Sequence, residues 1–535
     1  MIRNPLAAFN PKSPATLVLA VSVFIAITGN AAFFRKILEI YPLSRASLLS
    51  TFSLFVVLTA ATFLVLNLLG PGKLLKPVLV LSLILASMIA YAGGTFGMVA
   101  DETMIANLFK SDGREVHDLL TFKFFLYVAF LGVGPAIAVI AFPITARSRR
   151  REAFSRLKAI GLAFFLAVVA ILPFGRFYAS YLREHKDTRS YANPVYFYYS
   201  AGKYVSRFKD EVDEKMAELG LGAKIALHDQ TRDLVVLVVG ETARADHFSL
   251  NGYAKDTAPN LRRENAISLS DLWSCGTSTA VSVPCMFSPF GRANFSDRKF
   301  RRSQNLLDIL QKTGEVSVLW RDNNSDSKGV ADRVPFEDFR APDKNPICDE
   351  ECRDEGMLAG LQEYINGNQT KDLLIVLHQM GNHGPAYYNR YPASRERFRP
   401  ACRTKQLEDC TPEEINNAYD NAVAYTDEFL GKVIALLKRN EGPFDTAMVY
   451  MSDHGESLGE RGVYLHGLPY LIAPEAQKRP AGAIWLGDRM GKKIDLAKLT
   501  ARAKTPLSHD NLFHSMLGLF EIETKEYDPS LDLFH

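Results

Sequence analysis

The sequence predicts a bundle of five transmembrane α-helices followed by an α/β domain, and three observations support this fold class. Residues 1–177 contain five apolar runs near the ~20 residues that cross a hydrocarbon core of ~30 Å as a helix. The remaining residues alternate short Val/Leu/Ile-rich segments with helical patterns. All six cysteines lie in this second part, which separates it chemically from the first.

Composition and charge exclude several classes of protein. The 535 residues are 47% hydrophobic and 23% charged, with a formal net charge of +3. This composition excludes a disordered chain and gives no sign of a nucleic-acid partner, and the length favours two or more domains. The charge is divided unevenly, because residues 1–175 carry a net +9 and residues 176–535 a net −6. One part therefore has the composition of a membrane protein and the other that of a soluble domain.

The five apolar runs are interpreted as membrane spans. Lipid offers the backbone no hydrogen-bond partners, so successive runs almost without charge favour spanning helices over buried core helices or a cleavable signal peptide. Ten Lys/Arg residues lie in the tail and loops on the N-terminal side and six on the other side, which places the N-terminus in the cytoplasm. An odd number of spans then exports the remainder. The runs are Ala15–Phe34, Leu48–Leu69, Pro77–Met98, Phe124–Ile144 and Leu157–Phe177.

A segment rich in aromatic and basic residues follows the last run. Residues 177–204 contain nine aromatic side chains among Arg and Lys, a composition that favours the headgroup level of a membrane. A linker packed on the soluble domain is the alternative. We expect a transmembrane domain over 1–177, an interfacial bridge over 178–225 and an exported catalytic domain over 226–535.

The cysteines support export of the second part. They form local pairs separated by 10, 4 and 8 residues, which favours three short disulfides in an oxidising compartment. Zinc ligation by thiolates is the alternative, although no Cys-x2-Cys pair occurs, and six cysteines allow 15 pairings. The residues are Cys275, Cys285, Cys348, Cys352, Cys402 and Cys410.

The exported part has strand candidates typical of a largely parallel sheet. Near-continuous apolar segments alternate with helical patterns such as Asn417–Arg439. The strand candidates are Leu234–Val239, Val316–Trp320, Leu373–Leu377, Ala447–Met451 and Ala481–Leu486.

Polar side chains follow three of these strands. Sites in open α/β sheets gather beyond the carboxyl ends of the strands, so residues distant in sequence converge there. Oxygen and imidazole ligands together suit Zn²⁺, with Mn²⁺ as the next choice. The candidates are Glu241, His383, Asp453, His454 and His466. A single histidine or carboxylate would more often be structural, but the joint pattern predicts a metal site.

A hydroxyl-rich segment supplies the nucleophile candidates. Residues 274–285 resemble a turn that enters a helix, whose free N–H groups favour phosphate. A threonine hydroxyl needs a metal to lower its pKa before it can attack at neutral pH. Thr277, Ser278 and Thr279 cannot be separated by chemistry alone, and an N-cap in a disulfide-closed loop is the alternative interpretation.

Four motifs resemble those of the phosphoethanolamine transferases of Gram-negative bacteria, the family that includes mobile colistin-resistance enzymes. The resemblance covers essentially the whole chain and implies an alkaline-phosphatase-like (sulfatase-like) catalytic domain in the periplasm of a multi-pass inner-membrane protein. The motifs are Gly240-Glu241-Thr242-Ala243-Arg244, Ser274–Cys285, His378–Pro385 and Ser452–Glu456.

The resemblance also implies roles for individual residues. Thr279 would be the nucleophile and a zinc ligand together with Glu241, Asp453 and His454, while His383 and His466 would hold a second zinc or the transferred phosphate. Thr279 would take phosphoethanolamine from phosphatidylethanolamine, the donor, and pass it to a phosphate of lipid A, the acceptor, which would confer polymyxin resistance. The enzyme is expected to act as a monomer. Residues implied for the donor headgroup are Asn107, Ser111, Glu115, Ser325, Lys328 and His378.

The sequence leaves other functions open. Asn107, Ser111 and Glu115 repeat every four residues and would share one helix face, but an ordinary solvated helix would do the same. A membrane-tethered metal phosphohydrolase or sulfatase, a glycerol-phosphate polymerase, or a silent envelope scaffold would fit parts of the pattern. The acceptor could also be an inner-core sugar or a periplasmic glucan.

Overall fold

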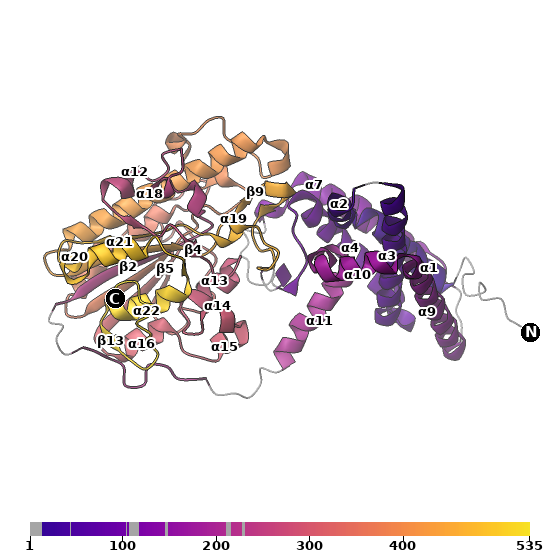
Figure 1. Ribbon diagram of the computed structural model, residues 1–535, viewed down its shortest axis with the longest axis horizontal. Helices are drawn as coiled ribbons and strands as arrows, with labels where there is room; N and C mark the ends of the chain where they lie inside the picture. The colour runs from indigo at the N-terminus through magenta and orange to yellow at the C-terminus, as the bar shows by residue number, and fades with distance from the viewer. Residues whose placement is uncertain are drawn as a thin grey trace, which may run out of the picture. The chain divides into compact units, whose positions relative to one another are not determined.

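The structure of the protein, a computed structural model, divides the chain into two compact units (Figure 1). It describes residues 13–42, 44–102, 104–105, 107, 117–144, 148–209, 216–226 and 231–535. The first unit comprises residues 1–105 and 119–206, and the second comprises residues 106–118 and 207–535. The second unit therefore includes part of the connection between the third and fourth apolar runs as well as the whole α/β domain.

Four helical stretches of the first unit are long and apolar enough to cross a membrane, within the residues that are described. They cover Ser47–Leu69, Gly72–Thr95, Phe122–Ala141 and Arg150–Phe174. Their principal helices are α3 (Arg45–Leu69), α4 (Leu75–Thr95), α7 (Phe122–Tyr127) with α8 (Gly134–Ala141), and α9 (Arg149–Ile171).

The first predicted span is a bent pair of helices rather than one straight helix. α1 (Pro14–Thr28) and α2 (Ala31–Ile40) meet at 54°, and the count of spans reaches the predicted five when this pair is one span. Buried Asn30 lies at the break, where its Nδ2 donates to Ile25 O at 3.0 Å and to Asn193 O at 2.8 Å. Asn193 N donates back to Asn30 Oδ1 at 2.9 Å. Asn193 Nδ2 also donates to Gly29 O at 2.9 Å, so a carbonyl at the break has a partner inside the protein.

The aromatic segment after the last span packs within the same unit. It forms α10 (Gly175–Glu184), a 3-10 helix η5 (Lys186–Tyr191) and α11 (Val195–Lys209). Tyr191 Oη donates to Gly97 O at 3.2 Å, and the hydroxyls of Tyr198 and Ser82 are 2.5 Å apart. Residues 178–206 therefore belong with the membrane helices, and their place at the headgroup level stays a prediction.

The second unit is built on a seven-stranded sheet in the order β3-β11-β8-β2-β7-β5-β6. Strands β8, β2, β7, β5 and β6 are parallel, whereas β11 is antiparallel to both its neighbours, so the sheet is mixed at one edge. All five predicted strands are present. The bounds are β2 Asp233–Gly240, β3 Ile267–Ser268, β5 Val316–Asp322, β6 Phe336–Asp338, β7 Asp372–His378, β8 Asp445–Ser452 and β11 Gly482–Leu486.

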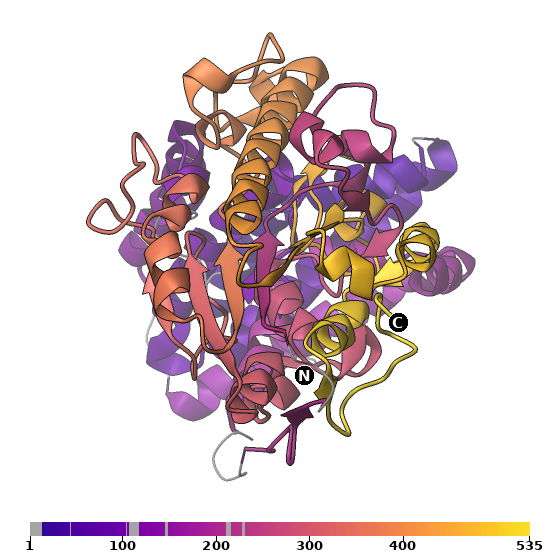
Figure 2. The same cartoon turned by 90° about the vertical axis from the view of Figure 1, so that its left-hand side faces the viewer.

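Helices cover both faces of this sheet, which is why its central strands are apolar throughout (Figure 2). Alternate β2 residues Val235, Leu237 and Val239 share one core cluster with α16 (Leu306–Lys312) and α22 (Asp510–Leu519). Helix α18 (Pro412–Arg439) packs against β8. It begins five residues before the predicted start, because Thr411 and Glu414 form a capping box around Pro412.

Three disulfides join the cysteines in the short local pairs that the spacing predicts: Cys275–Cys285, Cys348–Cys352 and Cys402–Cys410. Thiolate ligation of zinc by these residues is therefore excluded. The first bridge closes the loop that contains all three hydroxyl candidates, so the covalent link lies directly at the site.

Reduction of these bridges should lower the melting temperature of the purified protein, because a native disulfide typically contributes about 2–4 kcal/mol to folding stability. The measurement is thermal unfolding with and without dithiothreitol, with thiol titration as the control for complete reduction. An unchanged melting temperature after complete reduction would contradict the structural role.

Candidate metal centre and nucleophile

The carboxyl ends of two adjacent parallel strands bring the core of the site together. Glu241 directly follows β2, and Asp453 and His454 directly follow β8, its hydrogen-bonded neighbour. The side chains of all three residues are completely buried. Burying two carboxylates costs several kcal/mol per ion unless a partner of opposite charge compensates. The position of Glu241 and Asp453 at the strand ends therefore favours binding of a cation.

Thr279 completes this group from another direction. It is the first residue of α13 (Thr279–Met286), and its Oγ1 donates to Glu241 Oε2 at 3.0 Å. Its Oγ1 is also 3.5 Å from His454 Nε2. His454 Nε2 in turn lies 3.4 Å from Glu241 Oε1 and 3.2 Å from Asp453 Oδ2. Four residues thus direct ligand atoms toward one another.

These separations fit a tetrahedral metal ion. Ligands bound to zinc at about 2.0 Å in tetrahedral geometry are about 3.3 Å from one another. The observed separations of 3.0 to 3.5 Å lie on both sides of that value. A cation at the centre would also offset the repulsion between two carboxylates and an imidazole lone pair, which face one another with few protons between them. The donor set of oxygen and nitrogen therefore fits zinc.

The protonation of His454 suits a ligand. Its Nδ1 lies 2.8 Å from Gly455 O, to which it can only donate, so Nε2 carries the lone pair that faces the carboxylates. Burial, and then the nearby His466, lower the pKa of His454 to about 3, which keeps the ring neutral. Burial likewise raises the pKa of Asp453, the shift expected of a carboxylate that lacks its counter-charge.

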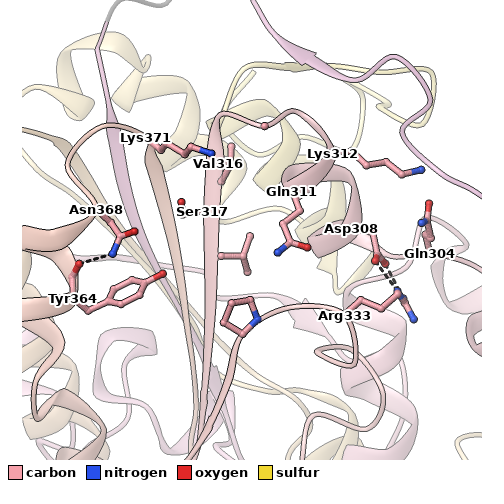
Figure 3. A pocket seen from close by; sticks show the side chains of 13 residues that line it. Gln304, Asp308, Gln311, Lys312, Val316, Ser317, Arg333, Tyr364, Asn368 and Lys371 are labelled. Carbon is pink, nitrogen blue, oxygen red and sulfur yellow. Dashed lines mark hydrogen bonds and ion pairs between the residues drawn. The ribbon is translucent and has the colours of Figure 1, made fainter.

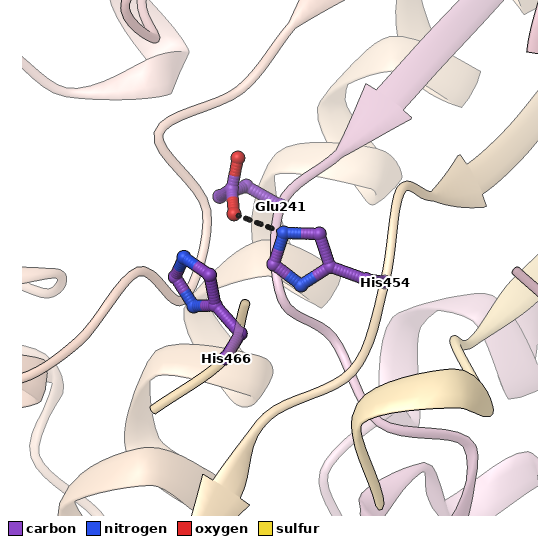
Figure 4. A group of neighbouring side chains, drawn as sticks. All are labelled: Glu241, His454 and His466. Atoms are coloured by element: carbon purple, nitrogen blue, oxygen red, sulfur yellow. Dashed lines mark ion pairs between the residues drawn. The ribbon is translucent and has the colours of Figure 1, made fainter. Parts of the chain in front are cut away.

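His383 and His466 stand beside this group. The ring centroids of His454 and His466 are 4.4 Å apart, and those of His383 and His466 are 5.1 Å apart. Glu241, His454 and His466 offer ligand atoms that all lie within 4.8 Å of one another (Figure 4). His466 Nδ1 is 2.7 Å from Glu456 Oε2, so the carboxylate orients the ring and leaves Nε2 as the coordinating atom. Burial lowers the pKa of His383 well below its ordinary value.

The structure separates the three hydroxyl candidates. Thr277 Oγ1 donates to Leu468 O at 2.5 Å, which anchors a neighbouring loop. Ser278 is the N-cap of α13 without a capping hydrogen bond, and its Oγ is buried. Among these three, only Thr279 contacts Glu241 and His454. This geometry favours Thr279 as the nucleophile.

Asn324 is a site residue that sequence reasoning missed. Its Nδ2 donates to Glu241 Oε2 and to Gln379 O, each at 2.7 Å, and thereby fixes the carboxylate against the loop after β7. It follows β5, which ends at Asp322 beside β7 in the sheet. The same rule about strand ends that identified Glu241 could have found it.

The residues expected at the donor headgroup divide into three groups. Ser111 and Glu115 lie outside the described residues, while Asn107 belongs to the catalytic unit and has a buried Oδ1. Lys328 Nζ donates to Ser325 Oγ at 2.5 Å, next to Asn324. His378 is completely buried, with Nδ1 2.8 Å from Asp322 Oδ2, so it lies behind the site rather than at its surface.

A cavity of about 670 Å³ lies elsewhere in the catalytic unit (Figure 3). It opens beside the first residues of β5, Val316 and Ser317, and is bordered by the Asp308–Arg333 ion pair. None of the residues that line it belongs to the candidate site, so we assign it no part in the chemistry.

His509 is another residue that only the structure identifies. It accepts a hydrogen bond from Cys275 N at Nδ1, at 3.1 Å, and donates from Nε2 to Ser452 O at 3.0 Å. It therefore links the nucleophile loop to the end of β8. Burial lowers its pKa to about 4.

This histidine gives a pH prediction. Its pKa is about 6.5 in the unfolded chain and about 4 in the folded protein, so the unfolded state binds more protons as the pH falls through this window. His509 should therefore cost the protein about 3 kcal/mol of stability between pH 7 and pH 4. Denaturant unfolding of the wild type and His509→Gln, which hydrogen-bonds without titrating, measures this. A stability difference between the two that does not change with pH would contradict it.

Comparisons with known proteins identify the family of the whole chain. Residues 233–522 match the family model described as sulfatase, and residues 58–208 match the model described as phosphoethanolamine transferase EptA/EptB. The chain is 41% identical over 526 residues to phosphatidylethanolamine transferase Mcr-1 of Escherichia coli, with 95% of each chain covered. It is 38% identical to phosphoethanolamine transferase EptA of E. coli K12, over 96% of this chain and 95% of that one.

A solved structure covers both units. The integral membrane protein lipooligosaccharide phosphoethanolamine transferase A of Neisseria meningitidis aligns with a TM-score of 0.93 at 33% identity, over 97% of this chain and 98% of that chain. Its soluble domain alone aligns at 39% identity over 60% of this chain.

Proposed function

This chain belongs to the lipid A phosphoethanolamine transferases of the sulfatase and alkaline-phosphatase superfamily, and we propose that it moves phosphoethanolamine from phosphatidylethanolamine to lipid A through Thr279. It is a multi-pass membrane protein with a periplasmic catalytic domain. The observation that carries the proposal is the Thr279 hydroxyl, which lies 3.0 Å from Glu241 Oε2 and 3.5 Å from His454 Nε2 at the start of α13.

The first half-reaction forms a bond between Thr279 Oγ1 and the phosphorus of the donor. The bond between phosphorus and the glycerol oxygen breaks, and diacylglycerol leaves after that oxygen takes a proton, which balances the proton that Thr279 loses. Glu241 Oε2, which already accepts the Thr279 hydrogen bond, is placed to receive the proton that the hydroxyl loses. The product on the enzyme is a phosphoethanolaminyl-threonine.

The second half-reaction reverses the roles of the two oxygens. An oxygen of a lipid A phosphate attacks the same phosphorus, the bond to Thr279 Oγ1 breaks, and Thr279 regains its proton. Thr279 is 8% exposed while Glu241, Asp453 and His454 are completely buried, so substrates approach from the side of Thr279. The proposed outcome for the cell is a less anionic lipid A and resistance to cationic polymyxins.

Zinc is the proposed cofactor, held by Glu241, Thr279, Asp453 and His454. When bound, it would lower the pKa of the threonine hydroxyl and neutralise phosphoryl oxygens. The chain contributes a rigid frame for this ion, because Asn324 fixes the Glu241 carboxylate and the Gly455 carbonyl sets the tautomer of His454. His383 and His466 are proposed to hold the transferred phosphate or a second zinc.

The donor headgroup is proposed to bind beside Ser325 and Lys328. The Lys328 ammonium, 3% exposed at its side chain, suits a phosphate oxygen of the donor. The Asn107 amide oxygen, which is buried in the same compact unit, suits the donor ammonium. Ser111 and Glu115 complete the proposed set, whereas His378 is left out of it because its side chain is completely buried against Asp322.

Thr279→Ala should abolish transfer, by more than about 1,000-fold, because no other hydroxyl of this loop contacts Glu241. Mass spectrometry of lipid A from cells that express each variant measures the added group. Ser278→Ala is the matched control, since it removes the neighbouring hydroxyl and leaves Thr279 in place; it should keep transfer within a few-fold. Transfer by Thr279→Ala at the wild-type level would overturn the assignment. Addition to a core sugar or glucan alone would correct the acceptor.

Removal of metal should abolish turnover of the purified enzyme, because the threonine hydroxyl then keeps its ordinary high pKa. The assay is release of diacylglycerol from vesicles that contain both phosphatidylethanolamine and lipid A after exhaustive chelation, followed by titration with zinc, manganese or magnesium. Zinc at one equivalent should restore activity most fully. Full activity in the metal-free protein would refute the mechanism.

A further inference from the structure

The main-chain turn behind Glu241 is held in an unusual conformation. Thr242, the next residue, has φ = 54°, in the left-handed region that a β-branched residue rarely adopts. Its N–H donates to Asp453 Oδ1 at 3.2 Å, and Ala243 N donates to Ser452 Oγ at 2.8 Å. The conformation therefore persists only if the surroundings hold it.

Tyr419 supplies two contacts to this turn from a distant part of the chain. It lies on α18 and is completely buried. Its Oη donates to Thr242 O at 2.5 Å and accepts from Arg244 N at 2.8 Å. One phenol hydroxyl thus satisfies the backbone of two residues that flank Ala243.

The ring that carries this hydroxyl is itself fixed. Its centroid is 5.2 Å from the His247 ring and 5.4 Å from the Tyr387 ring, both nearly perpendicular to it. Burial raises the pKa of Tyr419 well above its ordinary value, so the hydroxyl keeps the proton that it donates. Tyr387 Oη in turn donates to Glu456 Oε1 at 2.8 Å, and Glu456 orients His466.

We propose that Tyr419 is a positioning residue that sets the Glu241 carboxylate through the left-handed turn at Thr242. Without the hydroxyl, the Thr242 carbonyl loses a donor and the Arg244 N–H loses an acceptor inside the protein. The turn then relaxes toward ordinary φ values, and Glu241 moves away from Thr279 and His454. This inference rests on the proposed role of Glu241 as a zinc ligand.

Tyr419→Phe tests the inference, since it removes the hydroxyl and keeps the ring. Zinc affinity, measured by competition with a chromogenic chelator, should weaken about 10–100-fold, as for other residues that orient metal ligands. With lipid A present as the acceptor, the kcat for diacylglycerol release should fall in the same range, with the KM for the donor unchanged. Tyr425→Phe is the matched control: it removes a buried hydroxyl of the same helix that bonds Glu355 instead, and should leave both quantities within about twofold.

A second variant separates positioning from loss of folding. Glycine adopts positive φ without steric cost, so Thr242→Gly should make the turn independent of Tyr419. In that background, Tyr419→Phe should change zinc affinity by less than about threefold. Equal losses in both backgrounds, or zinc affinity in Tyr419→Phe equal to that of Tyr425→Phe, would overturn the inference. Failure of the wild type to bind zinc would instead refute the proposed function.

Discussion

Two buried carboxylates, an imidazole lone pair and a hydroxyl directed at one point form the constraint on which the rest of this structure depends. Keeping both Glu241 and Asp453 charged there costs free energy that a cation would compensate, because both side chains are completely buried. The separations of 3.0 to 3.5 Å among these ligand atoms leave room for an ion at their centre. The surrounding fold is best understood as the frame that prevents these groups from moving apart.

That frame is made of elements with different origins. The parallel pairing of β2 with β8 sets the distance between Glu241 and Asp453. The Cys275–Cys285 bridge closes the loop from which Thr279 begins α13, and His509 joins that loop to the end of β8. Asn324 holds the Glu241 carboxylate, and Tyr419 holds the backbone of Thr242 and Arg244, which follow Glu241 in the chain. Each of these contacts restricts the conformations in which the ligand side chains could turn away from one another toward water.

Much of this arrangement was predictable from the sequence, because its causes are local. Continuous apolar segments identify the buried strands, and clustered cysteines in an exported domain identify the disulfides. The rule about strand ends identifies Glu241, Asp453 and His454. The start of α18 and the site residue Asn324 could have been predicted in the same way, from the capping box at Thr411 and from the position of Asn324 after β5.

Other features depend on long-range contacts that no local pattern contains. The antiparallel direction of β11 follows from how the chain returns to the sheet. The composition of β11 resembles that of the parallel strands, so it does not indicate this direction. The bend at Asn30 depends on Asn193, more than 160 residues later. Tyr419 and His509 form hydrogen bonds with backbone groups. Every residue has such groups, so the sequence does not indicate which residues are their partners. Thr279 is distinguished from Thr277 and Ser278 only by what each hydroxyl contacts.

Thr279 is proposed to carry the phosphoethanolamine group between donor and acceptor. The most direct measurement is peptide mass spectrometry of the enzyme after incubation with phosphatidylethanolamine vesicles in the absence of lipid A. The peptide containing Thr279 should gain the mass of one phosphoethanolamine group, and should lose it when lipid A is added. A modified residue other than Thr279, or turnover with no modified peptide at any time, would contradict this role of Thr279.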